Sequence, residues 1–469
     1  MIFSIEHTHK KARTLAGKNA GFLIVFGLFL RKGRRGIIKK RVFELQLLAE
    51  GILIGLATGL IVSALRFLLE LAEGFRLRLY ADRMGDPFLL CVWFLALFAV
   101  AHLLYAVVRK EPLASGSGIP QVKGLLRGRL DAHWLRVLLL KFCGSLLAIS
   151  AGLSLGQEGP SVQLGASVGQ GVSRLRKRRR FREEHCLFMA GAGAGLAAAF
   201  NAPLAGVTFC IEELSHRVSA FIILTSIVAA ASAVAVSQSF FGMAPAFHFG
   251  VLPPVPLDGH YLCFILLALL VGGLGLLFNR ALLFSLDAYD RLEMRGASRF
   301  MLPLFAAGLL GLVLPEILGN GNVLVDRLFG EGYELRFLLL LLAGKFLFTL
   351  FCFGSGAPGG IFIPMLALGA VAGGVYAKAA VFLGWLDPSW EACCIVFGMA
   401  AFFSGAVKSP VSSSILIMEL TGSFDHMLIL LCVSLAASTV VDMADVPALY
   451  DALLQRRLRK IKKIDCEIS

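Results

Sequence analysis

Residues 156–170 read GQEGPSVQLGASVGQ and place a single acid, Glu158, between glycines and a proline. The surrounding chain of 469 residues is 57% apolar and only 16% charged, and its mean hydropathy is +0.79. A soluble protein needs more polar surface than this, so the composition predicts an integral membrane protein. A lone carboxylate in so apolar a chain requires an explanation.

The net charge is +14, and the basic residues gather near the ends and in one loop: KKARTLAGK, RKGRRGIIKKR, RLRKRRRFRE and LLQRRLRKIKK. In a membrane protein this pattern is typical of cytoplasmic segments. It predicts a multi-pass protein with both termini and the 174–182 loop in the cytoplasm. No motif for nucleic-acid binding accompanies the charge, and no histidine or cysteine spacing indicates a metal site.

Apolar stretches predict a bundle of helices, several of them interrupted by glycine or proline and some too short to span a bilayer. Ala20–Leu30 is also too short, and we expect an interfacial helix there, or a segment upstream of the true start. The other expected helices are 46–72, 88–108, 135–155, 186–211, 219–242, 261–286, 301–318, 335–353, 361–384, 392–406 and 411–441.

The chain also contains an internal repeat. PSVQLGASVG at 160–169 aligns with PMLALGAVAG at 364–373, at an offset of 204 residues. Pro203 precedes Glu212 by nine residues, and Pro410 precedes Glu419 by nine. The repeat predicts two homologous halves, parallel or inverted, with a substrate site where they meet.

Three breaks rich in glycine and proline precede apolar helical stretches: SGSGIP (115–120), GQEGP (156–160) and GSGAPGGIFIP (354–364). The start of a helix carries free N–H groups and a partial positive charge. Three converging starts would bind an anion without a full positive charge to trap it. The alternative is that these are ordinary breaks between spans.

In this order, the three motifs resemble the signature motifs of the CLC family of chloride channels and chloride/proton antiporters. The likeness continues through AAFNAPLAGVTFCIEEL (198–214) and PALY (447–450), and covers about residues 43–455. It implies an all-α integral membrane fold, an inverted repeat of tilted, partly discontinuous helices, in a homodimer with one pore per subunit. The 28 residues after Val441 leave no room for the cytoplasmic CBS domains of many eukaryotic members, so we expect the bacterial type, in the cell inner membrane.

The expected segments are a basic cytoplasmic part (1–42), a first membrane repeat (43–242), a linker (243–260), a second repeat (261–441), and a C-terminal helix with a basic cytoplasmic tail (442–469).

The resemblance also implies the site. The bound chloride would be held by the hydroxyls of Ser117 and Tyr450 and the backbone N–H groups of Ile361 and Phe362. Glu158 would be the external gate and proton acceptor, and Glu213 the internal proton-transfer residue. The supporting motif residues are Gly116, Gly118, Pro120, Gly156, Gly159, Pro160, Gly359 and Gly360.

The resulting expectation is chloride transport, coupled to protons by antiport, with no enzymatic activity and no cofactor besides bound chloride. A passive voltage- or pH-gated chloride channel on the same fold is the first alternative, and a transporter of organic anions the second. Three positions depart from the family pattern. Gln157 stands where many relatives have a basic residue, which predicts weaker anion attraction at the outer mouth. Lys123 stands where some bacterial relatives have an acid, so Lys141 is expected to lack its usual partner.

Overall fold

The computed structural model contains only helices, turns and loops in the part of the chain that it describes. It describes residues 44–81, 87–175, 181–215, 219–247, 249–250, 252–255, 260–292, 294, 296–330 and 332–468. The expected helix at Ala20–Leu30 lies outside these residues. All contacts discussed below lie within residues 51–469, which form one compact unit.

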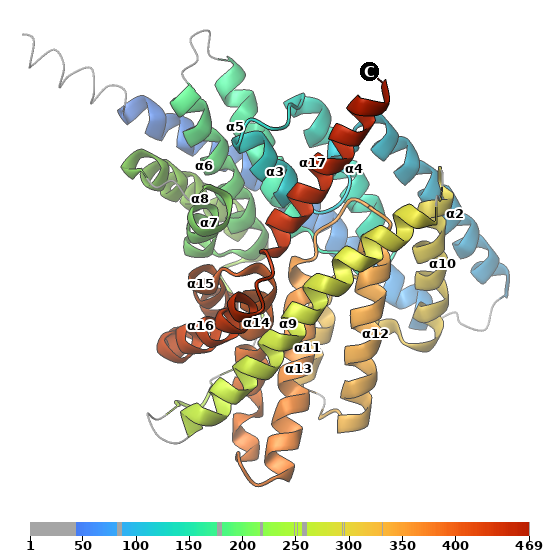
Figure 1. Cartoon of the computed structure of the whole chain (residues 1–469), viewed down its shortest axis with the longest axis vertical. Helices are drawn as coiled ribbons and strands as arrows, with labels where there is room; N and C mark the ends of the chain where they lie inside the picture. Colours follow the sequence, from blue (N-terminus) through green and yellow to red (C-terminus); the bar gives the residue numbers. More distant parts are fainter. Residues whose placement is uncertain are drawn as a thin grey trace, which may run out of the picture. The chain divides into compact units, whose positions relative to one another are not determined.

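The first described helix is Glu44–Ala81. The others carry the labels of Figure 1 and are α2 (Pro87–Lys110), α3 (Ile119–Leu126), α4 (Trp134–Ser150), α5 (Glu158–Leu175), α6 (Phe181–Phe200), α7 (Pro203–Phe209), α8 (Ala220–Phe241), α9 (His260–Arg291), α10 (Ser298–Val313), α11 (Asn322–Gly330), α12 (Leu335–Gly354), α13 (Phe362–Phe382), α14 (Glu391–Val407), α15 (Pro410–Thr421), α16 (Met427–Met443) and α17 (Leu449–Ile468).

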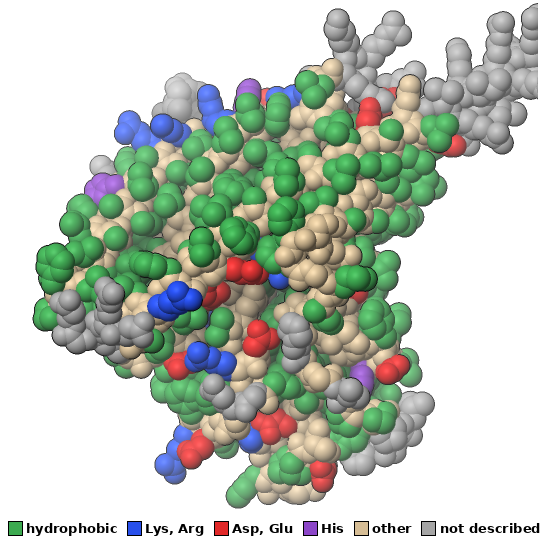
Figure 2. All heavy atoms as spheres, turned by 180° about the vertical axis from the view of Figure 1, so that it is seen from behind, with side chains coloured by type: hydrophobic (Ala, Val, Ile, Leu, Met, Phe, Trp, Pro, Cys, Tyr) green, Lys and Arg blue, Asp and Glu red, His purple; other side chains and the backbone are tan. Residues whose placement is uncertain are grey.

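Eight of the described helices are long and apolar enough to cross a membrane: Glu44–Ala81, α2, α8, α9, α12, α13, α14 and α16. Many of their apolar side chains point outward. On α2, for example, Phe88, Leu95 and Leu103 are exposed, and Figure 2 shows hydrophobic side chains over much of the visible face. Such a surface is stable against lipid rather than water, which confirms the expectation of a multi-pass membrane protein.

Two of the expected long helices are wrong, because each is broken in the middle. The expected helix 186–211 ends at Phe200, and α7 begins at Pro203 after Asn201, whose φ of 59° lies in the left-handed region. The expected helix 411–441 breaks at Gly422, with φ of 68°. Proline lacks an N–H and glycine adopts positive φ without strain, so both breaks follow local rules that hydropathy alone does not register.

Two helix pairs, α5 with α6 and α13 with α14, pack in the same way. A Cβ on Gly165 of α5 would lie 2.0 Å from the carbonyl oxygen of Gly191 on α6. In the second half, a Cβ on Gly369 of α13 would lie 2.5 Å from the carbonyl oxygen of Gly398 on α14. Only glycine permits backbones to approach this closely within a helix pair. The glycines that the repeat alignment equates therefore perform the same packing role.

Equivalent parts of the halves also contact each other reciprocally. The first-turn N–H groups of α7 donate to Glu419 of α15 at 3.1 and 2.7 Å, and those of α15 donate to Glu212 at 3.2 and 2.6 Å. Gly156 and Gly360 exchange both backbone hydrogen bonds, at 2.7 and 2.6 Å, in an antiparallel bridge. Both exchanges join positions that the repeat equates, so the halves meet around a local two-fold relation at these points.

Candidate anion and proton site

The three glycine- and proline-rich motifs lie together in the interior. The Gly156–Gly360 bridge joins the loops that precede α5 and α13. The loop before α3 joins the same cluster, because Gly116 accepts from the Gly359 N–H at 3.1 Å and donates to the Gly356 oxygen at 3.2 Å. The predicted convergence of three helix starts is thus present: α3 begins at Ile119, α5 at Glu158 and α13 at Phe362.

Close approach between the motifs depends on glycine at one position in particular. A Cβ on Gly159 would lie 2.5 Å from Ser117 Oγ and 2.6 Å from the Ser117 carbonyl oxygen. Ser117 therefore sits directly against the first turn of α5. Any larger residue at position 159 would push the hydroxyl away from this helix start.

The predicted site residues carry buried polar groups that the described protein leaves without partners. Ser117 Oγ, the Tyr450 hydroxyl and both carboxylate oxygens of Glu158 have no hydrogen-bond partner among the described residues, although all three side chains are almost completely buried. The backbone amides of Gln157 and Ile363 lie near the Glu158 carboxylate without forming a bond of good geometry. Unpartnered buried polar groups are costly, and these two hydroxyls can donate to an anion.

Tyr450 is placed by an aromatic cluster at the start of α17. Its ring stands edge-on to that of Phe209, with the ring centroids 6.4 Å apart. The Phe209 ring packs against Phe362, the first residue of α13, at a centroid distance of 5.9 Å. The N–H groups at the start of α13 have no acceptor within their own helix. The Tyr450 hydroxyl also lies within electrostatic reach of both Glu158 and Glu213. The structure thus brings Tyr450 together with the other predicted residues.

Glu213 lies on a π-helical turn, Cys210–Ser215, that continues α7. It is buried, accepting from Lys123 Nζ at 2.7 Å and from Ser409 Oγ at 3.0 Å. Its neighbour Glu212 instead caps α15, as described above. Consecutive side chains on a helical turn point in different directions, so Glu213 faces the interior and Glu212 faces the neighbouring helix. This geometry gives Glu212 a structural role at the start of α15.

Two buried lysines donate to backbone carbonyl oxygens just before helices, Lys141 before α3 and Lys345 before α11. Lys141 donates to the carbonyl oxygens of Ala114 at 3.0 Å and Gly116 at 2.5 Å, just before Ser117. Lys345 donates to those of Ile317 at 3.0 Å and Gly319 at 2.8 Å. Lys141 thus has carbonyl partners in place of an acid. Lys345 was not predicted, although it lies 204 residues after Lys141, at the offset of the repeat.

Lys123, the second departure from the family pattern, is also buried and bridges two acids. It contacts Glu213 at 2.7 Å and Asp451 at 2.9 Å, and Arg127 contacts the other oxygen of Asp451 at 3.0 Å. Burial alone would raise the pKa of Asp451, but Lys123 and Arg127 outweigh burial and hold that pKa below its usual range. Asp451 was missed, and its only signal in the sequence is its place directly after Tyr450.

Two separate cavities adjoin the site. One of about 370 Å³ is lined by Gly116 and Ser117 together with the basic side chains Arg299, Arg456, Arg457 and Lys460. Gln157 lines the other, of about 30 Å³, with Arg66 and Arg76. Gln157, at a position where many relatives have a basic residue, therefore lies near two arginines of the first described helix.

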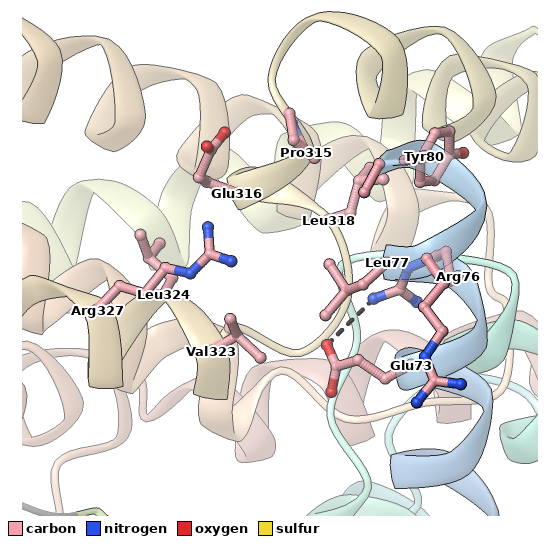
Figure 3. A pocket seen from close by; sticks show the side chains of 13 residues that line it. Glu73, Arg76, Leu77, Tyr80, Pro315, Glu316, Leu318, Val323, Leu324 and Arg327 are labelled. Atoms are coloured by element: carbon pink, nitrogen blue, oxygen red, sulfur yellow. Dashed lines mark hydrogen bonds and ion pairs between the residues drawn. The ribbon is translucent and has the colours of Figure 1, made fainter. Parts of the chain in front are cut away.

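Arg76 also lines a larger cavity of about 460 Å³, shown in Figure 3. There it donates to Glu73 at 3.1 Å, while Arg327 and Glu316 stand on another part of the wall. Arg66 and Arg76 are each paired with an acid, Glu70 and Glu73, respectively. Their charges are thus largely balanced, and the expectation that Gln157 weakens anion attraction stays a prediction.

Membrane-spanning helices around a buried polar site with adjoining cavities are the arrangement of a membrane transport protein. The chain belongs to the voltage gated chloride channel family, whose model matches residues 95–442. This is a family of transport proteins, not enzymes. The chain is 34% identical over 444 residues to the H(+)/Cl(−) exchange transporter ClcA of Citrobacter koseri, covering 91% of this chain and 93% of that protein.

Further relatives and solved structures agree. The ClcA exchange transporter of Vibrio cholerae serotype O1 is 34% identical over 424 residues, covering 88% of this chain and 89% of the relative. The crystal structure of a slow cyanobacterial Cl⁻/H⁺ antiporter has a TM-score of 0.82 at 32% identity and covers 88% of this chain and 98% of that one. A eukaryotic CLC transporter, with a TM-score of 0.73 at 24% identity, covers 88% of this chain and 74% of its own and shows the shared fold.

Proposed function

We propose that this protein exchanges chloride for protons across a membrane, with chloride held by Ser117, Tyr450 and the backbone N–H groups of Ile361 and Phe362. The observation that carries the proposal is the set of buried, unpartnered polar groups at the converging helix starts. Two hydroxyls without acceptors suit a small anion that accepts hydrogen bonds. The similarity to exchangers named for protons and chloride supports the choice of ions.

Glu158 acts in this proposal as the external gate and proton acceptor. It is the first residue of α5, in the same partial positive field that attracts chloride. Ionised, the carboxylate competes with chloride for the site and closes the path. Protonated, it is neutral and no longer competes. Each proton taken up by Glu158 thereby frees the path for chloride, which is how the two ions are coupled.

Glu213 acts as the internal proton-transfer residue. It is buried, and α3, which carries its partner Lys123, also contacts the first turn of α5 through Gly118 and Gly159. We place Glu213 on the cytoplasmic side, because α17 starts there and continues into the basic segment LLQRRLRKIKK. The cavity beside Ser117, with its four basic side chains, is then the cytoplasmic opening for anions.

The remaining organisation is proposed on the same basis. The reciprocal contacts of equivalent segments support an inverted repeat with halves at 43–242 and 261–441, joined by the linker 243–260. The basic segments 1–42 and 442–469 support cytoplasmic termini. A homodimer with one pore per subunit follows from the family resemblance.

The decisive test is flux through purified protein in sealed liposomes, with chloride and pH recorded together. A chloride gradient should drive protons uphill through the wild type. Glu158→Gln should stop proton movement while chloride flux persists, because a neutral side chain imitates the protonated gate. The same change at Glu391, which pairs with Lys378 away from the site, should leave coupling intact. Full coupling in Glu158→Gln would remove Glu158 from the gate, and an uncoupled wild type would identify a passive channel.

A further inference from the structure

A line of alternating charges connects Glu213 to the surface of the protein. Lys123 is fully buried and contacts Glu213 at 2.7 Å and Asp451 at 2.9 Å. The two inner side chains are almost unexposed, at 4% for Glu213 and 0% for Lys123. The two outer ones are partly exposed, at 24% for Asp451 and 37% for Arg127. The interior end is therefore shielded from water, and the end at Asp451 is accessible to it.

Among the described residues, Lys123 is the one charged side chain in contact with Glu213. The second oxygen of Glu213 accepts from the neutral hydroxyl of Ser409. The adjacent acid, Glu212, is engaged by the N–H groups of α15. α3 supplies Lys123, Arg127 directly follows this helix, and α17 supplies Asp451. Tyr450 also lies near Glu213, but on the side of the buried site. Among the described residues, Lys123 is the ionisable side chain that links Glu213 to the partly exposed Asp451.

We propose that Asp451 takes up protons from the cytoplasmic water and that Lys123 carries them from Asp451 to Glu213. This inference rests on the proposed exchange of chloride for protons, and it names the residues that supply the internal acid. It also assigns a role to Lys123, which departs from the family pattern.

The transfer balances in two steps. First, the Lys123 ammonium gives a proton to the Glu213 carboxylate, which leaves a neutral amine beside a neutral acid. Then Asp451, after taking a proton from water, gives it to the amine and restores both the ammonium and its own carboxylate. Both steps occur between atoms already in contact, and no co-reactant is consumed.

Lysine suits this role for a chemical reason. A buried amine can release its proton, whereas a guanidinium stays protonated in proteins. Because Lys123 and Arg127 hold the pKa of Asp451 low, its protonated form is rare at neutral pH. Proton uptake should therefore accelerate as the cytoplasmic pH falls.

The experiment measures the ratio of chloride to proton flux in liposomes for the full-length chain. Asp451→Asn keeps the side-chain shape and removes the titratable group, so proton flux should fall about tenfold or more while chloride flux persists. Asp451→Glu should restore proton flux. Lys123→Arg retains a charge between the two acids but cannot release a proton, so it should also lose proton flux. Asp442→Asn, which removes an exposed partner of Lys408, is the matched control and should leave the ratio unchanged.

Two results would overturn the proposal. An unchanged flux ratio in Asp451→Asn would show that protons bypass Asp451, and full coupling in Lys123→Arg would reduce Lys123 to a positioning residue. Thermal unfolding of each variant identifies any that fail to fold. If Asp451→Asn fails to fold, Asp451→Glu tests the proposal instead, because its proton flux should still accelerate at low cytoplasmic pH. A wild-type protein that moves no protons would refute the proposed exchange. A wild-type protein that is coupled, together with an unaffected Asp451→Asn variant, would refute only the role of Asp451.

Discussion

Replacing Tyr450 with phenylalanine separates the binding role of its hydroxyl from the packing role of its ring. Phenylalanine keeps the edge-on contact with Phe209 and removes only the hydroxyl. Among the described residues that hydroxyl has no hydrogen-bond partner. Without chloride, the variant should therefore be at least as stable as the wild type, because no bond within the protein is lost.

Chloride affinity should fall, since a hydrogen bond to a charged group contributes about 1.5–3 kcal/mol. This corresponds to an increase in the dissociation constant of between about tenfold and about a hundredfold. Bound ligand stabilises a protein by about 2.7 kcal/mol at a concentration 100 times its dissociation constant. A tenfold weaker site at the same chloride concentration would retain roughly half of this stabilisation.

Isothermal titration with chloride measures the affinity, and thermal unfolding with and without chloride measures the stabilisation. Tyr289→Phe is the matched control, because the Tyr289 hydroxyl is also buried and unpartnered among the described residues but lies outside the proposed site. It should leave both quantities unchanged. Equal chloride affinity in wild type and Tyr450→Phe would refute the assignment of Tyr450 to the anion site.

Two further predictions concern the framework around the site. Gly165→Ala should prevent normal folding, because its Cβ would lie 2.0 Å from a backbone oxygen of α6. The control Gly74→Ala, whose Cβ would have no heavy atom within 4 Å, should fold normally. Yield and size-exclusion profiles in detergent compare the two variants, and a well-folded Gly165→Ala would contradict the packing. Glu419→Gln should lower stability by about 0.5–2 kcal/mol, the usual range for a helix cap, because it weakens the two bonds to the α7 amides; an unchanged unfolding temperature would show that this cap contributes little.

Much of the candidate site could be predicted from the sequence because it lies on the backbone of helix starts. Glycine and proline at fixed spacing indicate where a helix begins, and the three motifs begin α3, α5 and α13 as expected. Glu158 is recognisable because a lone acid among such motifs is rare in an apolar chain. Tyr450 was identified only through the family resemblance, since nothing in its local sequence points to an anion.

The missed features depend on contacts between distant segments. The spacing from Pro203 to Glu212 and from Pro410 to Glu419 is visible in the sequence, but the exchange of caps between the two copies is not. Asp451 and Lys123 lie 328 positions apart in the chain, so their ion pair has no local signal. Lys123 could be noted as a departure from a family pattern, yet its partners became evident only when α3 and α17 were placed side by side, as in Figure 1.

Two helices connect the proposed anion site with the charged line, and this has a consequence for coupling. α3 follows Ser117 and carries Lys123, and α17 carries Tyr450 next to Asp451. A shift of α17 that lengthens the contact between Lys123 and Asp451 would also displace the Tyr450 hydroxyl, because Tyr450 and Asp451 are adjacent in the first turn of α17. If Asp451 takes up protons as proposed, its protonation would weaken the attraction to Lys123 at the start of α17, where Tyr450 lies. Proton uptake at the surface and chloride binding in the interior would therefore act on the same two helices, without a separate element to link them.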